Sequence, residues 1–246
     1  MKAAPQEQQR LLDLQAIDTR LDQIQHARTH LPQLAELTEL QRKADVIGAE
    51  HVRMQTAHDD VQRELRKSEA DVQQVRDRAA RDEARLGSGT GTAKDLQALQ
   101  HELESLARRQ RELEDVELEV MERAEAIESD LAELESGRER VATQLAELEA
   151  ARDAALARLE EEAAQISAPR VRVSAELGPD LLALYEKIRA SSGGLAAAAL
   201  RQRRCGGCQL ELNAVEIGRI RSAAEDEILR CEECRRILVR TPESGV

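Results

Sequence analysis

Apolar residues recur in a 3-4 spacing along most of the chain, and the pattern is most regular between residues 96 and 166. It persists for ten heptads without a slip, whereas an ordinary amphipathic helix, with a period of about 3.6 residues, would drift out of phase. The spacing therefore predicts the seam of a left-handed coiled coil. The seam positions are Leu96, Leu99, Leu103, Leu106, Gln110, Leu113, Glu117, Val120, Ala124, Ile127, Leu131, Leu134, Arg138, Val141, Leu145, Leu148, Arg152, Ala155, Leu159, Glu162 and Ile166.

The segment 11–86 has the same order with weaker seam residues. Its phase slips beside Pro32, where we expect a kink or a break because proline lacks an N–H. Polar seam residues, among them His51 and His58, are expected to loosen the packing and set the register. The seam positions are Leu14, Ile17, Leu21, Ile24, Arg28, Leu31, Leu34, Leu37, Leu40, Ala44, Ile47, His51, Met54, His58, Val61, Leu65, Ser68, Val72, Val75, Ala79, Asp82 and Leu86.

A glycine-rich stretch separates the two seams. Its three glycines in five residues end a helix, and Thr92 followed by Asp95 predicts the N-cap and capping-box partner of the next helix. Two helices of similar length joined by a short turn near 87–92 predict a long antiparallel two-helix coiled-coil hairpin over residues 1–170, and the fold class is mainly α. An intermolecular coiled coil is the alternative, which the short connection disfavours, and the oligomeric state stays open.

The remaining residues, 171–246, have a different character. Pro169 is expected to end the second long helix, and a short connecting helix is expected at about 180–190. A small β-rich unit should then occupy about 195–241. Its expected elements are strands at 195–204, 209–212, 228–230 and 236–240 and a helix at 214–221, although the alanines at 196–199 prefer a helix.

All four cysteines lie in this unit, as two Cys-x-x-Cys pairs separated by 22 residues. Two such pairs fit one tetrahedral zinc ion held by four thiolates, and a closed site of this kind is structural. The metal would replace the hydrophobic core that a small unit without aromatic rings cannot build. The predicted ligands of one structural Zn²⁺ are Cys205, Cys208, Cys231 and Cys234.

Composition excludes several classes of function. The chain of 246 residues has one Tyr and no Trp or Phe, which argues against a compact enzyme, and no catalytic set of side chains stands apart from the many carboxylates. The formal net charge is −12, with −14 on residues 1–166 (23 basic, 37 acidic) and +2 on residues 167–246 (13 basic, 11 acidic). The long segment should therefore repel phosphate backbones. We predict no enzymatic activity and no small-molecule substrate.

Neither a secretory signal nor a transmembrane segment is expected, because the N-terminus lacks an apolar core and no apolar run approaches 18 residues. We therefore expect a cytoplasmic protein without a membrane partner, whose thiols stay reduced.

Two surfaces are candidates for binding. The glycine-rich turn is not a phosphate-binding loop, because its lysine precedes an aspartate at a helix start, but an exposed tip is suited to docking a partner. Arginines of the small unit are suited to gripping phosphates, although no aromatic ring offers base stacking. The tip residues are Gly87, Ser88, Gly89, Thr90, Gly91, Thr92 and Lys94, and the arginines are Arg201, Arg203, Arg204, Arg219, Arg221, Arg235 and Arg236, with Arg230 and Arg240 nearby.

Three stretches resemble the bacterial family of coiled-coil proteins with a C-terminal four-cysteine zinc ribbon: KDLQALQHEL at 94–103, LYEKIR at 184–189 and the double knuckle that ends in RIL at 236–238. The resemblance implies a hairpin, a zinc ribbon and no catalysis, and some members of the family look like adaptors for transcription factors or messenger RNA. Such ribbons usually have Gly after the second cysteine of the last knuckle. Here Arg235 stands at that place and Gln209 follows the first knuckle, and a positive φ at a residue other than glycine would cost ~1 kcal/mol or more.

We therefore predict a non-enzymatic adaptor that binds a protein partner of the gene-expression machinery through the hairpin tip, the ribbon or both. The alternative is an RNA- or DNA-binding regulator that grips phosphates with the ribbon arginines.

Overall fold

The computed structural model describes all 246 residues and contains five helices and four strands. The chain divides into two compact units. Unit 1 comprises Met1–Leu34 and Ala150–Val246, and unit 2 comprises Ala35–Glu149. The elements are α1 (Pro5–Thr29), α2 (Pro32–Gly87), α3 (Ala93–Ala175), α4 (Pro179–Ser191), β1 (Ala197–Arg201), β2 (Arg204–Cys205), α5 (Ala214–Ser222), β3 (Leu229–Arg230) and β4 (Ile237–Val239).

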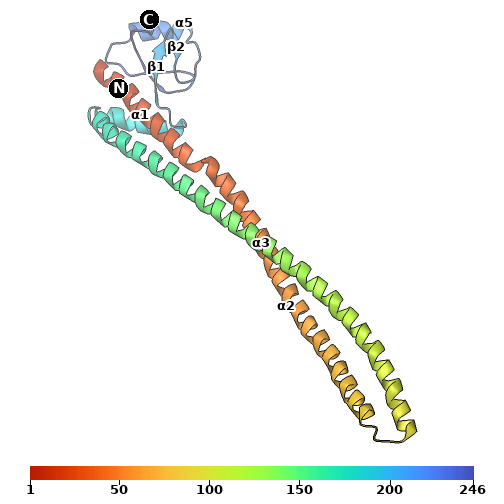
Figure 1. Cartoon of the computed structure of the whole chain (residues 1–246). Coiled ribbons are helices and arrows are strands. Elements are labelled where there is room, and N and C mark those ends of the chain that lie inside the picture. Colours follow the sequence, from red (N-terminus) through yellow and green to blue (C-terminus); the bar gives the residue numbers. More distant parts are fainter. The chain divides into compact units, whose positions relative to one another are not determined.

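Unit 2 is the helical hairpin. Figure 1 shows α2 and α3 running side by side to the turn that joins them. Ion pairs between the helices establish the antiparallel direction, because the partner on α3 moves backward along the sequence as the residue on α2 moves forward. Such pairs join Glu64 to Arg123 at 2.8 Å and Arg76 to Glu114 at 2.6 Å. The predicted hairpin is confirmed, and the seams meet within one chain.

The seam of unit 2 follows the heptads closely. Val61, Val120 and Ala124 form its most buried cluster, and nearly every predicted position is at least half-buried. Arg138 is the exception, since it is exposed and forms an ion pair with Glu135 at 3.2 Å. A guanidinium is costly to bury, so the helix turns it to solvent and the neighbouring Gly137 comes to lie near Ile47 instead. Outside this unit, Arg28 and Leu34 are also exposed.

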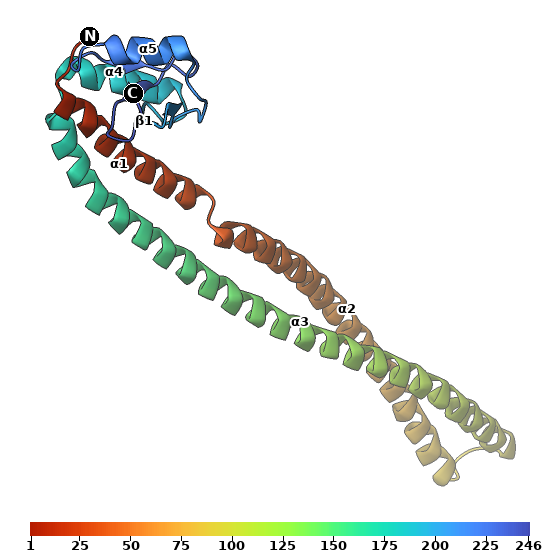
Figure 2. The same ribbon diagram turned by 90° about the horizontal axis from the view of Figure 1, so that it is seen from above.

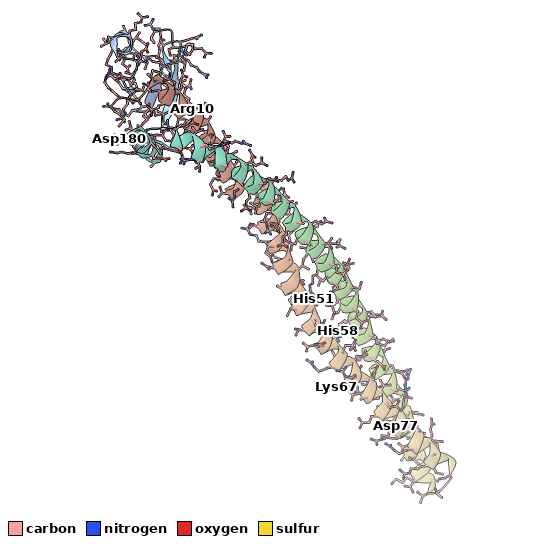
Figure 3. All side chains as sticks on the ribbon, turned by 90° about the vertical axis from the view of Figure 1, so that its left-hand side faces the viewer. Arg10, His51, His58, Lys67, Asp77 and Asp180 are labelled. Carbon is pink, nitrogen blue, oxygen red and sulfur yellow. The ribbon has the colours of Figure 1, made fainter.

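The two polar seam histidines keep partners across the hairpin. His51 Nε2 lies 3.1 Å from Glu135, and His58 Nε2 lies 3.4 Å from Glu128; both histidines stand on α2 where it runs beside α3 (Figure 3). Each ring replaces an apolar contact with a specific polar one, so the histidines favour one register over its neighbours.

The turn between α2 and α3 forms as expected. Gly89 has a φ of 64° and Gly91 a φ of 143°, conformations that residues with a Cβ avoid. Thr92 and Asp95 make the capping box: Asp95 Oδ2 accepts from the Thr92 N–H at 3.0 Å, and Thr92 Oγ1 accepts from the Asp95 N–H at 3.3 Å. The Thr92 hydroxyl also donates to the carboxylate, and these hydrogen bonds lower the pKa of Asp95.

The first seam is broken where expected. The helix stops at Thr29 and restarts at Pro32, with a short non-helical step between them (Figure 2). Proline has no N–H to offer the preceding turn and disfavours a helical conformation in the residue before it. Pro32 therefore occupies the first turn of α2, where the N–H is not needed.

The prediction that Pro169 ends the second long helix was wrong. The helix α3 continues through this proline to Ala175. The lost hydrogen bond and the ring clash cost a few kcal/mol, but the last turns of α3 carry side chains that unit 1 buries. Arg170 reaches a buried carboxylate, and Val173 packs against the core cluster. Tertiary packing therefore outweighs the local preference to stop.

The β-rich part forms one four-stranded sheet in the order β2-β1-β4-β3. The strands β1 and β4 are parallel, with Ala198 opposite Leu238, and the outer pairs are antiparallel. The strand predicted at 209–212 does not form: its one ladder contact is an isolated bridge between Arg204 and Glu211, and β2 pairs with β1 instead. The first strand forms in spite of its alanines, because both of its faces are covered by other elements.

Alternate residues of β1 and β4 enter two separate cores. Ala197 and Ile237 face a cluster that contains side chains of α1 and α4, including the fully buried Tyr185. Ala198 and Leu238 face a second cluster made with α5 and the cysteines. The sheet is thus buried on both faces, which explains why its central strands read as continuous apolar runs.

The helix α1 is fastened to the sheet by polar contacts. The Gln15 carbonyl oxygen accepts from the N–H groups of Ala196 and Ala197 at 2.6 and 3.1 Å, and its amide donates to the Gly194 carbonyl at 2.9 Å. Ahead of α1, the Ala3 N–H donates to the Asp226 carbonyl. The first and last segments of the sequence therefore share one folded unit.

A buried carboxylate joins three helices of unit 1. Asp18 is fully buried, accepts from Arg170 Nε at 2.5 Å and from the Tyr185 hydroxyl at 2.8 Å, and lies 3.4 Å from Arg189 Nε. The resulting hydrogen bonds raise the pKa of Arg170, and burial together with Asp18 raises the pKa of Tyr185. The stretch 184–189 thus contributes both a ring and a cation to this network.

We expect the Asp18→Asn variant to lose about 3 kcal/mol of unfolding free energy, because it removes the buried carboxylate that Arg170, Arg189 and the Tyr185 hydroxyl share. Both arginines keep their second partners, Glu186 and Asp22. Urea denaturation followed by circular dichroism measures the loss. The matched control is Asp13→Asn, since Asp13 pairs with Arg10 at 3.0 Å on the surface and an exposed pair contributes under about 1 kcal/mol. Equal losses in the two variants would contradict the assignment.

Candidate metal centre

The four cysteine sulfurs gather at one point beneath the second core of unit 1. All four Sγ atoms lie within 4.8 Å of one another. The Cys205 and Cys234 sulfurs are 3.8 Å apart, and those of Cys208 and Cys231 are 3.9 Å apart. Each close pair joins the two knuckles rather than lying within one, so both halves of the ribbon are needed to complete the cluster.

Each knuckle closes by the same backbone turn. The Gln209 N–H donates to the Cys205 carbonyl at 2.8 Å, and the Arg235 N–H donates to the Cys231 carbonyl at 3.0 Å. Gln209 and Arg235 have φ values of 65° and 61°. Both residues that follow a knuckle therefore have a positive φ, including Arg235, which stands where such ribbons usually have glycine, and each bears the steric cost of its Cβ.

The knuckle glycines serve a different purpose. A Cβ on Gly206 would lie 2.8 Å from the carbonyl oxygen of Ala199, and the Gly206 N–H donates to that oxygen at 2.9 Å. The first knuckle can therefore lie directly against β1 because position 206 has no side chain.

The thiols differ in how readily they ionise. Burial raises the pKa of Cys205 to about 12, against a smaller opposing effect from the N–H groups of Cys208 and Gly207, and burial also raises the pKa of Cys231. Burial works in the same direction at Cys234, but hydrogen bonds, led by the Arg236 N–H, outweigh it and lower that pKa. A cation among the sulfurs would favour the thiolate form at all of them.

This donor set fits zinc. Four sulfurs about 2.3 Å from a tetrahedral centre stand about 3.8 Å from each other, which matches the Sγ–Sγ distances of 3.8 and 3.9 Å. Thiolate ligands select zinc or iron-sulfur centres over hard cations. A zinc ion held by four thiolates has no open coordination position, and its contribution is to fold the ribbon.

A buried glutamate supports the second knuckle, and our sequence reasoning missed it. Glu216 is 3% exposed, and its carboxylate accepts from the Glu232 N–H at 3.1 Å. Its own N–H donates to Asn213 Oδ1, which caps α5. The available signal was Asn213 followed three residues later by glutamate, the pattern of a capping box, although here the carboxylate reaches the knuckle instead of the cap.

Several ribbon arginines are occupied within the chain. Arg236 donates to the carbonyls of Leu195 and Ser192 at 2.8 and 3.1 Å. Arg240 donates to three carbonyls at the end of α5, at 2.6–3.4 Å, where a cation also complements the helix dipole. Arg230 donates to the Arg235 carbonyl, and Arg219 pairs with Glu232 at 3.0 Å.

The other predicted arginines are exposed and belong to different elements. Arg201 and Arg204 line the same groove beside β1, whereas Arg221 belongs to the last turn of α5 and Arg235 to the second knuckle. Arg203 occupies the turn between β1 and β2, with a φ of 65°. Phosphate binding by these arginines stays a prediction.

The tip residues predicted as a docking point, from Gly87 to Thr92 together with Lys94, are all exposed. Their polar groups are partly engaged in the turn itself, since the Ser88 hydroxyl donates to the Arg85 carbonyl at 2.7 Å. Partner binding at this tip also stays a prediction.

The architecture defines a class of protein: a long helical hairpin followed by a small zinc ribbon built on two Cys-x-x-Cys knuckles. Residues 14–193 match the CT398-like coiled coil hairpin domain, and residues 204–238 match the C4-type zinc ribbon domain. The chain belongs to the CT398-like hairpin family. Neither of the matched families is a known class of enzyme.

Relatives extend over almost the whole chain. The uncharacterized protein Rv2229c of Mycobacterium tuberculosis is 39% identical over 240 residues, which is 98% of each chain. A solved structure from Mycobacterium smegmatis is 37% identical, covers 98% of this chain and 100% of its own, and has a TM-score of 0.86. The structure of CT398 from Chlamydia trachomatis, at 18% identity, covers 96% and 98% with a TM-score of 0.69 and shares the fold.

None of the helices combines the length and the apolar character that crossing a bilayer requires.

We expect one zinc ion per chain by elemental analysis, and we expect Cys205→Ser to abolish it and melt the ribbon, because metal binding supplies most of the folding free energy of such modules. Tyr185 is the one tyrosine and packs against β1 and β4, so its near-ultraviolet signal should fall while helical circular dichroism is largely retained. Glu233→Ser, in an exposed position of the second knuckle, is the matched control and should keep its zinc. Full zinc content in Cys205→Ser would contradict the four-thiolate centre.

Proposed function

We propose that this protein is a non-enzymatic adaptor that acts in the cytoplasm and binds a protein partner of the gene-expression machinery through the hairpin tip, the ribbon or both. The observation that carries the proposal is the cluster of four cysteine sulfurs. Bound to one zinc ion as four thiolates, they would leave no coordination position for a substrate. The ribbon is then a scaffold whose outer surface is available for binding.

The use of the arginines favours a protein partner over a nucleic acid. Arg219, Arg230, Arg236 and Arg240 are engaged with carbonyls or a carboxylate of the chain itself. The one Tyr, Tyr185, is fully buried, and the ribbon contains no Trp, Phe or His, so the ribbon offers no exposed ring for a base to stack on. The acidic hairpin adds repulsion to any long phosphate backbone.

The tip presents exposed side chains on a short turn. Its two positive-φ glycines form the turn, and the Thr92–Asp95 capping box holds the start of α3. An exposed loop between two long helices is suited to docking a partner.

A crosslinking pull-down on wild type, a tip variant, a ribbon variant and a control variant tests the proposal. The tip variant carries Ser88→Ala, Thr90→Arg and Lys94→Glu, which keep the glycines and the capping box. The control variant carries Lys67→Glu, an exposed position on α2 (Figure 3). We expect wild type and control to recover the same protein partner, and nuclease treatment should not reduce its recovery. The tip variant, or a ribbon variant with Arg203→Glu, should recover about tenfold less of the partner, which corresponds to about 1.4 kcal/mol of binding free energy.

Ultraviolet absorbance distinguishes the proposed adaptor from the alternative, a nucleic-acid-binding regulator. The chain has one Tyr and no Trp, so the pure protein absorbs very weakly at 280 nm. A nuclease-sensitive peak at 260 nm that survives moderate salt, with no protein partner recovered, would overturn the adaptor proposal in favour of a nucleic-acid-binding regulator. Recovery of the partner with all variants would exclude both proposed surfaces.

A further inference from the structure

A groove of about 750 Å³ lies between α1 and the β1 side of the ribbon, entirely within unit 1. One wall is the outer face of α1 around Ala16, and the other is formed by β1 and the first knuckle. We call it the α1–β1 groove. Its lining includes an aliphatic part, with Leu12, Ala16 and Leu195 beside the alanines of β1, and a polar part that contains arginines and glutamines.

The charge of the groove is opposite to that of the chain. Three arginines line it, Arg20, Arg201 and Arg204, and no aspartate or glutamate does, although the net charge of the protein is −12. Arg204 makes no ion pair, and Arg201 has only a distant partner, Glu243, at 3.6 Å. Arg20 is held by Glu162 at 2.5 Å. The guanidinium groups of Arg201 and Arg204 are thus exposed at the groove, and carboxylates of the chain neutralise them little.

The groove is built into the fold. The carboxamide of Gln15 binds the backbone at residues 194–197 and the Thr19 hydroxyl, and Gly206 brings the first knuckle against β1. The first knuckle, which we assign to zinc, and the docking of α1 therefore determine the shape of the groove. A preformed surface of this kind binds a partner without much reorganisation.

The chemistry of the lining favours an acidic protein segment. Carboxylates pair with guanidinium groups in a bidentate geometry, and the aliphatic part of the lining accepts small apolar side chains. The side-chain amide of Gln202 is exposed and makes no hydrogen bond within the chain, so it can donate to or accept from a peptide backbone. A nucleic acid would find no aromatic ring in the lining of the groove to stack on.

We propose that the α1–β1 groove binds an acidic segment of the partner protein. Arg201 and Arg204 pair with carboxylates of that segment, and the aliphatic part of the lining contacts an apolar side chain that lies between the carboxylates. This inference rests on the proposed function, because it names the kind of segment by which the adaptor recognises its partner. It predicts affinity that falls with ionic strength.

Fluorescence anisotropy on the full-length, zinc-loaded protein tests the groove. The probe is a fluorescein-labelled ten-residue peptide in which Glu and Asp alternate with Leu and Ala, and a labelled decauridylate of equal length is the nucleic-acid probe. We expect the Arg201→Glu/Arg204→Glu variant to bind the peptide at least about tenfold more weakly than wild type. The matched control, Arg172→Glu/Arg221→Glu, makes the same change of charge at two exposed positions outside the groove and should change the affinity less than about threefold.

Three outcomes of the anisotropy assay would overturn the inference. They are the absence of saturable peptide binding up to about 1 mM, an equal loss of peptide affinity in both double variants, and RNA binding that is tighter than peptide binding and is abolished in the Arg201→Glu/Arg204→Glu variant. A photo-crosslinking residue in place of Gln202 should label the peptide, and labelling that is equally strong in the Arg201→Glu/Arg204→Glu variant would also contradict the inference. Because the peptide assay needs no cellular partner, its failure beside a successful pull-down would reject the groove and leave the adaptor function standing.

Discussion

The assembly of four cysteine sulfurs at one point is the constraint on which the ribbon depends. A module of this size without an aromatic ring buries too little apolar surface to fold unaided. Bringing Cys205 and Cys208 against Cys231 and Cys234 ties together two segments that are distant in sequence, and a metal held there offsets the entropy of ordering both. The second core depends on this point, and so does the wall of the α1–β1 groove that β1 and the first knuckle form.

The other half of unit 1 depends on polar contacts between helices and sheet. Gln15 satisfies backbone groups at the start of β1, and Asp18 gathers cations and a hydroxyl from α3 and α4. Isolated buried charges would be costly, so these groups tolerate only one arrangement of the helices. The same specificity explains how α3 passes through Pro169, since stopping there would remove Arg170 from its partner.

How far the sequence predicts the structure differs between the parts. The hairpin seam, the break at Pro32 and the capping box at Thr92 could be predicted because they rest on local spacing and local backbone chemistry. The ligand set could be anticipated because Cys-x-x-Cys spacing has few alternative uses. Glu216 and the arginine-lined groove could not, because the first contacts Glu232 and the second joins α1 to β1, positions that no local pattern relates.

By itself the sequence determined the two long helices, their turn and the identity of the clustered thiols, since each follows from residues close together in the chain. Tertiary structure alone decided that α3 continues to Ala175, that β2 rather than residues 209–212 pairs with β1, and that Arg236 turns inward to carbonyls while Arg204 stays exposed. The physical reason is the same in each case: the free energy comes from contacts between residues far apart in sequence, and it exceeds the local preferences that the sequence pattern records.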